Sequence, residues 1–247
     1  MGIKTWQILM SIILVYDKNH DQILKTLAQL EKVKAYNFGF ETIVSFLNPA
    51  PDFEDELRSY YPEVVVEKSV KKSVAQAKNK AAMICKSNEL LFLDPVFKIP
   101  PLMLLTLYQQ KIIHKDYSIL TARQQDTNGN EIISAGYFSQ VPIYDKFPNI
   151  IQSIYNWATK DNSEISNVDW ICESLFMIDK KSFQKSGGWY EEDFFMYSGI
   201  ELSSRVLEQN GKIGCLNNVV FLNQYAPERK QPLYIPKNWV GLQNKKN

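Results

Sequence analysis

An almost unbroken apolar run, "ILMSIILVY" from Ile8 to Tyr16, constrains the fold of this chain more than any other feature. A strand that is apolar at successive positions has both faces buried, which is typical of a parallel sheet covered by helices. After the polar stretch "DKNHD", apolar residues between Ile23 and Leu30 recur at helical spacing. Together the two segments predict a strand–loop–helix unit, the building block of α/β proteins.

The same alternation continues through the N-terminal half of the chain. Further strands are predicted at "ETIVSFL" from Glu41, at "EVVVE" from Glu63 and at "ELLFLD" from Glu89. An amphipathic helix precedes the last of these strands, and Ser69 is a candidate for its N-cap. Asp94 stands at the carboxyl end of the last strand, which is where open α/β sheets bind ligands.

The second half has a different character. The Asn128–Gly129 pair between apolar stretches predicts a β-hairpin. Helices are expected near 147–159 and from Ser198 to a stop at Asn210–Gly211, and strands at "SLFMID" and "KIGCLNNVVFL". We therefore expect an α/β fold, in which a single domain has a mainly parallel central sheet flanked by helices and an added hairpin region.

Charge and composition limit the function classes. The formal net charge of +1 provides no broad basic surface, so nucleic acid is not expected as a partner. The 2 histidines exclude a His-rich zinc site, and the 3 cysteines lack a CxxC spacing, which favours a reduced compartment. The longest apolar run is too short to span a bilayer, so we expect a cytoplasmic protein.

The end of the chain differs in composition from the rest. Residues 1–225 are expected to form the domain, and residues 226–247 a basic, Pro-rich tail. The tail combines lysine and arginine with aromatic residues such as Tyr234 and Trp239. Such a mixture suits a bilayer interface, so peripheral contact with the inner face of the membrane is an accessory hypothesis.

Three segments carry a resemblance to a known family. They are "AQAKNKAAMICKSNELLFLDP", "DTNGNEIISAGYF" and "SGGWYEEDFFMYSGIELSSRVLEQNGKIGCLNN". In order and spacing, from about Ile8 to Asn223, the chain resembles the family-2 glycosyltransferases, particularly their bacterial rhamnosyltransferase-like branch. The resemblance implies a GT-A fold and inverting transfer of a sugar from a nucleotide-sugar donor to an acceptor hydroxyl. It also implies a saccharide or lipid-linked acceptor, in surface polysaccharide or glycoconjugate synthesis.

The resemblance places a donor-binding site at the ends of the first two strands. Leu47 replaces the aspartate of the family's Asp-Asn-x-Ser motif, which removes one directional contact worth about 1 kcal/mol. The candidate donor-binding residues are Val15, Tyr16, Asp17, Asn48, Asp52 and Asn79. The alternative is that Asn48 and Asp52 are loop and cap residues.

The metal motif of the family is half present. Asp94 matches its first aspartate, and Val96 replaces its second. Mg²⁺ and Mn²⁺ take oxygen ligands, often one or two carboxylates together with substrate phosphates, so Asp94 is the candidate ligand of a site that Val96 weakens. The alternative is that Asp94 is a strand-end turn residue before Pro95.

The position of the catalytic base is altered. The resemblance places an acidic pair where this chain has Ser198 and Gly199, which leaves Glu201, Glu191 and Glu192 as the candidate catalytic carboxylates. Two alternatives are open: Ser198 and Glu201 form a capping box, and the acids before the helix form a solvated turn.

On the acceptor side, the candidates are Glu173, Trp170 and Trp189. Glu173 stands where the family often has a glycine, and it either narrows the acceptor pocket or adds a carboxylate to it. The two tryptophans form a sugar-stacking wall or belong to the core.

Two functional hypotheses follow. In the first, the chain is an active transferase with a rearranged site. In the second, it is a catalytically inactive GT-A domain that serves as a binding or partner subunit, with a sugar or a protein partner in the former cleft.

Overall fold

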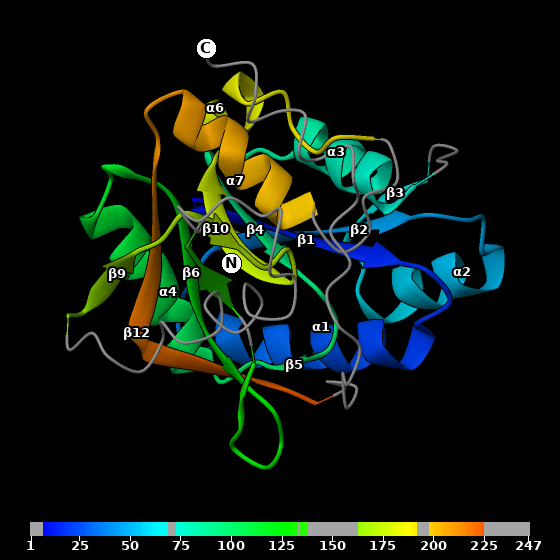
Figure 1. Cartoon of the computed structure of the whole chain (residues 1–247). Coiled ribbons are helices and arrows are strands. Elements are labelled where there is room, and N and C mark those ends of the chain that lie inside the picture. The colour runs from blue at the N-terminus through cyan, green and yellow to red at the C-terminus, as the bar shows by residue number, and fades with distance from the viewer. Residues whose placement is uncertain (1–6, 69–72, 133, 138–162, 192–197, 225–247) are drawn as a thin grey trace.

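The computed structural model describes residues 7–68, 73–132, 134–137, 163–191 and 198–224, and these form a mixed α/β structure around one large sheet (Figure 1). The order of strands across the sheet is β3-β2-β1-β4-β11-β6-β12-β5, with β7 paired to β6 and β9 paired to β12. A separate ribbon is formed by β8 (Ala135–Gly136) and β10 (Trp170–Ile171). The remaining strands are β1 (Met10–Tyr16), β2 (Phe40–Phe46), β3 (Val65–Glu67), β4 (Glu89–Leu93), β5 (Phe97–Lys98), β6 (Tyr117–Gln125), β7 (Glu131–Ile132), β9 (Ile165–Asn167), β11 (Leu175–Asp179) and β12 (Lys212–Asn223).

The first four strands are parallel, as the buried apolar runs predict. β1 lies between β2 and β4, and β3 flanks β2. Side chains of β1 alternate between two cores: Ile12 and Leu14 pack on one face of the sheet and Ile13 on the other. The strand is therefore apolar throughout because both of its faces are covered.

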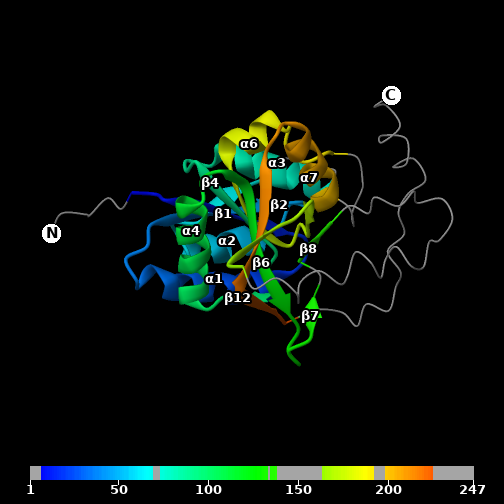
Figure 2. The ribbon, with the colours of Figure 1, turned by 60° about the vertical axis from the view of Figure 1, so that its left-hand side comes forward.

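Helices cover both faces of the sheet, which gives three layers (Figures 1 and 2). The core on one face includes side chains of α1 (His20–Lys34), α2 (Pro51–Tyr60) and α4 (Pro101–Ile113). The core on the other includes side chains of α3 (Val74–Ile84), α6 (Lys180–Lys185) and α7 (Ser198–Glu208). The predicted α/β class with a mainly parallel, helix-flanked sheet is confirmed.

The predicted hairpin is also present, between β6 and β7. Gly129 adopts a φ of +83°, which a side chain would disfavour. The carboxylate of Asp126 accepts hydrogen bonds from the backbone N–H groups of Asn128 and Asn130, both at 2.8 Å. The turn is thus closed by its own first residue, in the manner of an Asx turn.

Two helix ends differ from the sequence prediction. α3 begins at Val74, and its N-cap is Ser73, whose Oγ accepts from the backbone N–H of Gln76 at 3.2 Å. Ser69, the predicted cap, lies outside the described residues. After α7 the left-handed residue is Asn210, with a φ of 61°, rather than Gly211. Asparagine tolerates this conformation, so it ends the helix there.

Some expectations fall where the structure gives no description, namely the helix near 147–159 and the tail of residues 226–247. Among the helices that are described, none is long and apolar enough to cross a membrane.

Candidate active site

The candidate site lies at the carboxyl ends of β1, β2 and β4. The chain runs outward from β1 to β2 and β3 and then returns to the other side of β1 as β4, so the strand order reverses there. In open α/β sheets this reversal leaves a crevice at the carboxyl ends of the strands, where ligands bind. Asp17 follows β1, Asn48 lies just beyond β2 and Asp94 follows β4.

Two of the predicted donor-binding residues meet at this edge. Asn48 Nδ2 lies 3.5 Å from Asp17 Oδ1, and both residues are exposed. The backbone N–H of Asp17 donates to Asn19 Oδ1 at 2.9 Å, which fixes the loop after β1. Asp52 is exposed in the first turn of α2, where a carboxylate is favoured by the helix dipole.

Tyr16 and Val15 lie below this surface. Tyr16 is buried, and its ring stacks on Phe53 with 4.5 Å between centroids and packs near Phe46 at 4.9 Å. Val15 is partly buried in β1. The aromatic cluster therefore forms the floor under the loop that carries Asp17.

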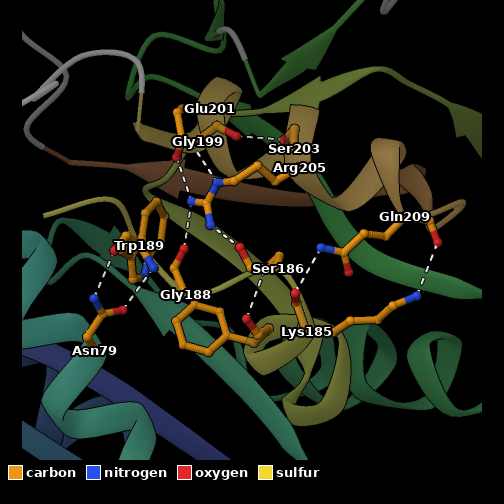
Figure 3. Close-up of polar contacts among 11 residues, drawn as sticks. Asn79, Lys185, Ser186, Gly188, Trp189, Gly199, Glu201, Ser203, Arg205 and Gln209 are labelled. Carbon is orange, nitrogen blue, oxygen red and sulfur yellow. Dashed lines mark hydrogen bonds and ion pairs between the residues drawn. The ribbon is translucent and has the colours of Figure 1, made fainter.

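Asn79 binds protein backbone through both ends of its amide (Figure 3). Its Nδ2 donates to the carbonyl of Trp189 at 2.8 Å, and its Oδ1 accepts from the N–H of Trp189 at 2.8 Å. A Cβ at Gly188, whose φ is +71°, would lie 2.7 Å from Asn79 Oδ1, so this close approach requires glycine. The side chain thus ties α3 to the segment before α7.

Glu201 is held by Arg205, one helical turn further along α7 (Figure 3). Arg205 Nε donates to Glu201 Oε1 and Nη2 donates to Oε2, both at 2.6 Å. Nη2 also donates to the carbonyl of Gly188 at 2.6 Å, and Nη1 donates to that of Ser186. The carboxylate is 13% exposed and both of its oxygens bind Arg205, which argues against the capping-box alternative.

The other candidate carboxylates of this region lie elsewhere. Glu191 is exposed, and its Oε2 accepts from Gln76 Nε2 at 2.9 Å while its Oε1 lies 3.3 Å from Asn79 Nδ2. Glu192 lies outside the described residues. Glu191 is therefore tied to α3 at the surface.

Gly199 packs directly against backbone, which sequence reasoning missed. A Cβ at this position would lie 2.4 Å from the carbonyl oxygen of Ile171 and 2.8 Å from the nitrogen of Glu173. The first turn of α7 therefore rests on the segment between β10 and β11. The sequence did contain a signal for this contact. Compared with the family that the chain resembles, Gly199 stands at an acidic position and Glu173 stands at a position that is often glycine.

The carboxylate of Glu173 acts on the neighbouring thiol. Burial, together with the negative charges of Glu173 and Asp94, raises the pKa of the Cys172 thiol to about 11. Asp94 and the Glu173 segment are also joined through backbone, because the N–H of Asp94 donates to the carbonyl of Ser174 at 2.8 Å. Glu173 and Asp94 thus lie on the same side of the site.

Trp170 and Trp189 are both buried. The indole of Trp170 lies against Gly136, where a Cβ would be 2.3 Å from the ring. Trp189 is 2% exposed and packs edge-on against Phe92, with ring centroids 5.3 Å apart. This placement favours the core alternative for both side chains.

Lys78 is the residue beside Asp94 that sequence reasoning missed. Its Nζ lies 3.7 Å from Asp94 Oδ1, and its side chain is 7% exposed. The signal was its spacing, because Lys78 lies four residues after Val74 and four before Ala82 and so shares their face of the helix.

The residues around Asp94 do not fit a divalent cation well. The side chain of Val96 offers no oxygen, and the Lys78 ammonium lies 3.7 Å from Asp94 Oδ1. Within the described ranges, no group of three or more His, Cys, Asp and Glu side chains is placed to hold a metal ion. The Mg²⁺ or Mn²⁺ expected from the resemblance would therefore have one carboxylate, already paired with a cation.

Comparison with known proteins shows that the fold of this chain is similar to that of several solved structures. No protein-family model matches the sequence, and neither does any curated protein. Among solved structures, GalNAc-T7 with UDP, GalNAc and Mn²⁺ has a TM-score of 0.67 at 12% identity, over 92% of this chain and 45% of that one. The mannosyltransferase PcManGT from Pyrobaculum calidifontis, with GDP-Man and Mn²⁺, has a TM-score of 0.59 at 12% identity, over 92% and 59%. S. aureus TarS 1-349 has a TM-score of 0.55 at 13% identity, over 88% and 60%.

The chain thus spans 45 to 60% of the length of these proteins. At such low identity the likeness concerns the fold alone. The likeness agrees with the GT-A fold that the three sequence segments predict.

Proposed function

We propose that this chain, which has the GT-A fold of glycosyltransferases, moves a sugar from a nucleotide-sugar donor to an acceptor hydroxyl. The observation that carries the proposal is the position of two carboxylates at one edge of the sheet. Asp17 and Asp94 follow the neighbouring parallel strands β1 and β4, at the point where the strand order reverses and ligands bind in such sheets. The neighbours described with UDP and with GDP-Man support a nucleoside diphosphate as the ligand class.

The donor nucleoside is assigned to the ends of β1 and β2. Asp17, Asn48 and Asp52 are exposed there and offer hydrogen-bonding groups to a base and ribose. Val15 and Tyr16 support this surface from below. Asn79 contributes indirectly, since its amide holds the Trp189 backbone. Asp94 is the group assigned to the diphosphate side of the donor.

An inverting transfer needs a carboxylate that accepts the acceptor's proton. The acceptor oxygen bonds to the anomeric carbon, the bond from that carbon to the diphosphate breaks, and the nucleoside diphosphate leaves. Glu201 is poorly suited to take the proton, because Arg205 binds both of its oxygens. Glu191 is tied to Gln76 at the surface. The position of Glu173 gives it the best support as the base, because its backbone abuts Gly199 and its charge acts on the thiol that Asp94 also affects.

The alternative function is a GT-A domain that binds a sugar or a protein partner without turnover. The observation that favours it is the same Glu201–Arg205 pair, since a carboxylate near the expected position of the base serves a structural role. The two functions differ in one property: both bind a ligand, and only one releases a nucleoside diphosphate.

The finer assignments depend on the sequence alone. They are membership of the family-2 rhamnosyltransferase-like branch, a saccharide or lipid-linked acceptor in surface polysaccharide or glycoconjugate synthesis, and a cytoplasmic location at the inner face of the membrane. Loss of liposome binding on deletion of residues 227–247 would support the last of these.

The test screens UDP-, GDP- and dTDP-sugars for release of nucleoside diphosphate and for thermal stabilisation, with and without Mn²⁺. A ligand at 100 times its Kd stabilises by about 2.7 kcal/mol, which is easily detected. We expect Glu173→Gln to lower turnover by about 10²- to 10⁴-fold while leaving donor affinity and Tm unchanged. The exposed Glu208, at the far end of α7, supplies the control Glu208→Gln, which should behave as wild type.

Each outcome of the screen separates the hypotheses. Stabilisation by a nucleotide sugar without any release of nucleoside diphosphate would favour the binding domain. An active protein whose Glu173→Gln variant keeps full turnover would exclude Glu173 as the base. If no donor gives either stabilisation or turnover, a conventional transferase is excluded.

A further inference from the structure

We propose that the ammonium group of Lys78 supplies the positive charge that holds the donor diphosphate, in place of a divalent cation at Asp94. The inference rests on the proposed function and deepens it, because it assigns the part of the site that recognises the leaving group. It follows from the contacts that Lys78 makes within the described part of the chain.

Lys78 is held in place from three sides. Its Nζ lies 3.7 Å from Asp94 Oδ1, donates to the carbonyl of Glu173 at 3.4 Å and lies 4.8 Å from the ring centroid of Trp189. A lysine is rarely buried to this degree unless its charge is compensated. A carboxylate, a carbonyl and an aromatic face together provide that compensation, so the charge is stabilised next to Asp94.

The charge balance at this strand end differs from that of a two-carboxylate metal site. Two carboxylates would repel a diphosphate until a divalent cation neutralised them. Here Val96 removes one of the carboxylates, and Lys78 neutralises the other. A diphosphate can therefore approach Asp94 without a metal ion.

The ammonium also opposes a divalent cation at the same place. A Mg²⁺ or Ca²⁺-type ion binds carboxylate oxygen at about 2.0–2.6 Å. An ion at Asp94 Oδ1 would lie close to the Lys78 ammonium, 3.7 Å from that oxygen, and the two cations would repel each other. Binding of the metal would require Lys78 to move away.

Lys78 retains donors for a phosphate oxygen. Its distance from Asp94 is longer than a hydrogen bond, and its hydrogen bond within the described residues goes to the Glu173 carbonyl. The ammonium has three N–H groups on a flexible four-carbon stem. Asp94 is 38% exposed and borders solvent, so a diphosphate that reaches it comes within range of the ammonium after a small shift of the lysine side chain.

The test measures binding of UDP, GDP and dTDP to the full chain by calorimetry, in EDTA and in MnCl₂. We expect at least one of them to bind in EDTA, with a Kd that Mn²⁺ changes by less than about 3-fold. Lys78→Gln should weaken that binding by at least about 10-fold, since a hydrogen bond to a charged group is lost. Lys78→Arg keeps the charge and should retain binding, and Lys80→Gln, an exposed lysine two residues along α3, is the matched control.

The outcomes separate this proposal from the proposed function. Binding that needs Mn²⁺ and is abolished by EDTA would overturn the role of Lys78 and leave the transferase intact. Unchanged binding by Lys78→Gln would overturn it as well. No binding of any nucleoside diphosphate, with or without Mn²⁺, would refute both. If Lys78→Gln does not fold, the comparison of EDTA with Mn²⁺ on the wild-type chain decides.

Discussion

Replacement of Arg205 by alanine should destabilise this protein strongly. The guanidinium group joins four partners: both oxygens of Glu201 and the carbonyls of Ser186 and Gly188. Without it, a carboxylate that is 13% exposed loses its counter-ion, and two carbonyls lose their donor. A buried charge or polar group left without a partner retains its full desolvation cost.

The magnitude follows from the burial of the pair. Removing one partner of a fully buried ion pair costs about 3–5 kcal/mol. Because Arg205 is 24% exposed and water can partly replace it, we expect a loss of about 2–4 kcal/mol. In a chain of this length, each 1 kcal/mol lowers Tm by about 2–4 °C, so Tm should fall by roughly 4–16 °C. Arg205→Lys keeps the charge without the fork and should lose about half as much.

Urea unfolding followed by far-UV circular dichroism measures the free energy, and a thermal scan measures Tm. The control is Arg58→Ala on α2, where Arg58 forms the same i,i+4 pair with Glu54 at 2.7 Å but is 59% exposed. Glu54 is 15% exposed, but Lys68 remains beside its carboxylate at 3.1 Å after the change. This variant leaves no carboxylate unpaired and should change the free energy of unfolding by about 0.5 kcal/mol or less. The double variant Glu201→Ala/Arg205→Ala should lose less free energy of unfolding than the two single variants lose in sum, because neither charge is then left without its partner.

An equal effect of Arg205→Ala and Arg58→Ala would refute this reasoning. The pair would then contribute nothing to the fold, and Glu201 would be available for chemistry. If Glu201→Gln also lowered turnover without lowering Tm, Glu201 would be restored as the catalytic base.

Two further predictions concern other positions. Gly199→Asp should destabilise the protein by about 1–3 kcal/mol without raising turnover, because its Cβ would lie 2.4 Å from the Ile171 oxygen; a stable variant with higher turnover in the donor assay would contradict this. Burial raises the pKa of Glu89 above its usual 4.5, against the opposing charge of Lys111, so its stabilising contribution is present below pH 4.5 and is lost as the pH rises through the raised pKa. Glu89→Gln should therefore gain stability relative to wild type between pH 4.5 and pH 7 in urea unfolding, and a constant difference would contradict the assignment.

The parallel half of the fold could be predicted because its signals are local. A strand buried on both faces is apolar at successive positions, and the run that ends at Tyr16 shows this directly. The turn between Asp126 and Asn130 could also be predicted from the sequence, since its own residues determine its conformation. Asp94 was placed correctly at the end of a strand for the same reason.

The partners of the site residues could not be predicted, since they come from distant parts of the chain. Asn79 meets Trp189 across 110 residues, and nothing around Asn79 in the sequence indicates that its amide binds backbone. Lys78 resembled a solvated lysine because a polar residue on an amphipathic helix usually faces water. The Glu201–Arg205 spacing was visible, but it also fits a weak surface pair, and only its burial distinguishes the two.

The order of strands has a consequence for synthesis of the chain. β4 pairs with β1 on one side and with β11 on the other, and β11 begins only at Leu175. A nascent chain that has completed β4 therefore exposes an apolar strand edge until much of the remaining chain has left the ribosome. Such an edge invites pairing with other chains, so we expect the emerging N-terminal half to be the stage most prone to aggregation and most dependent on chaperones.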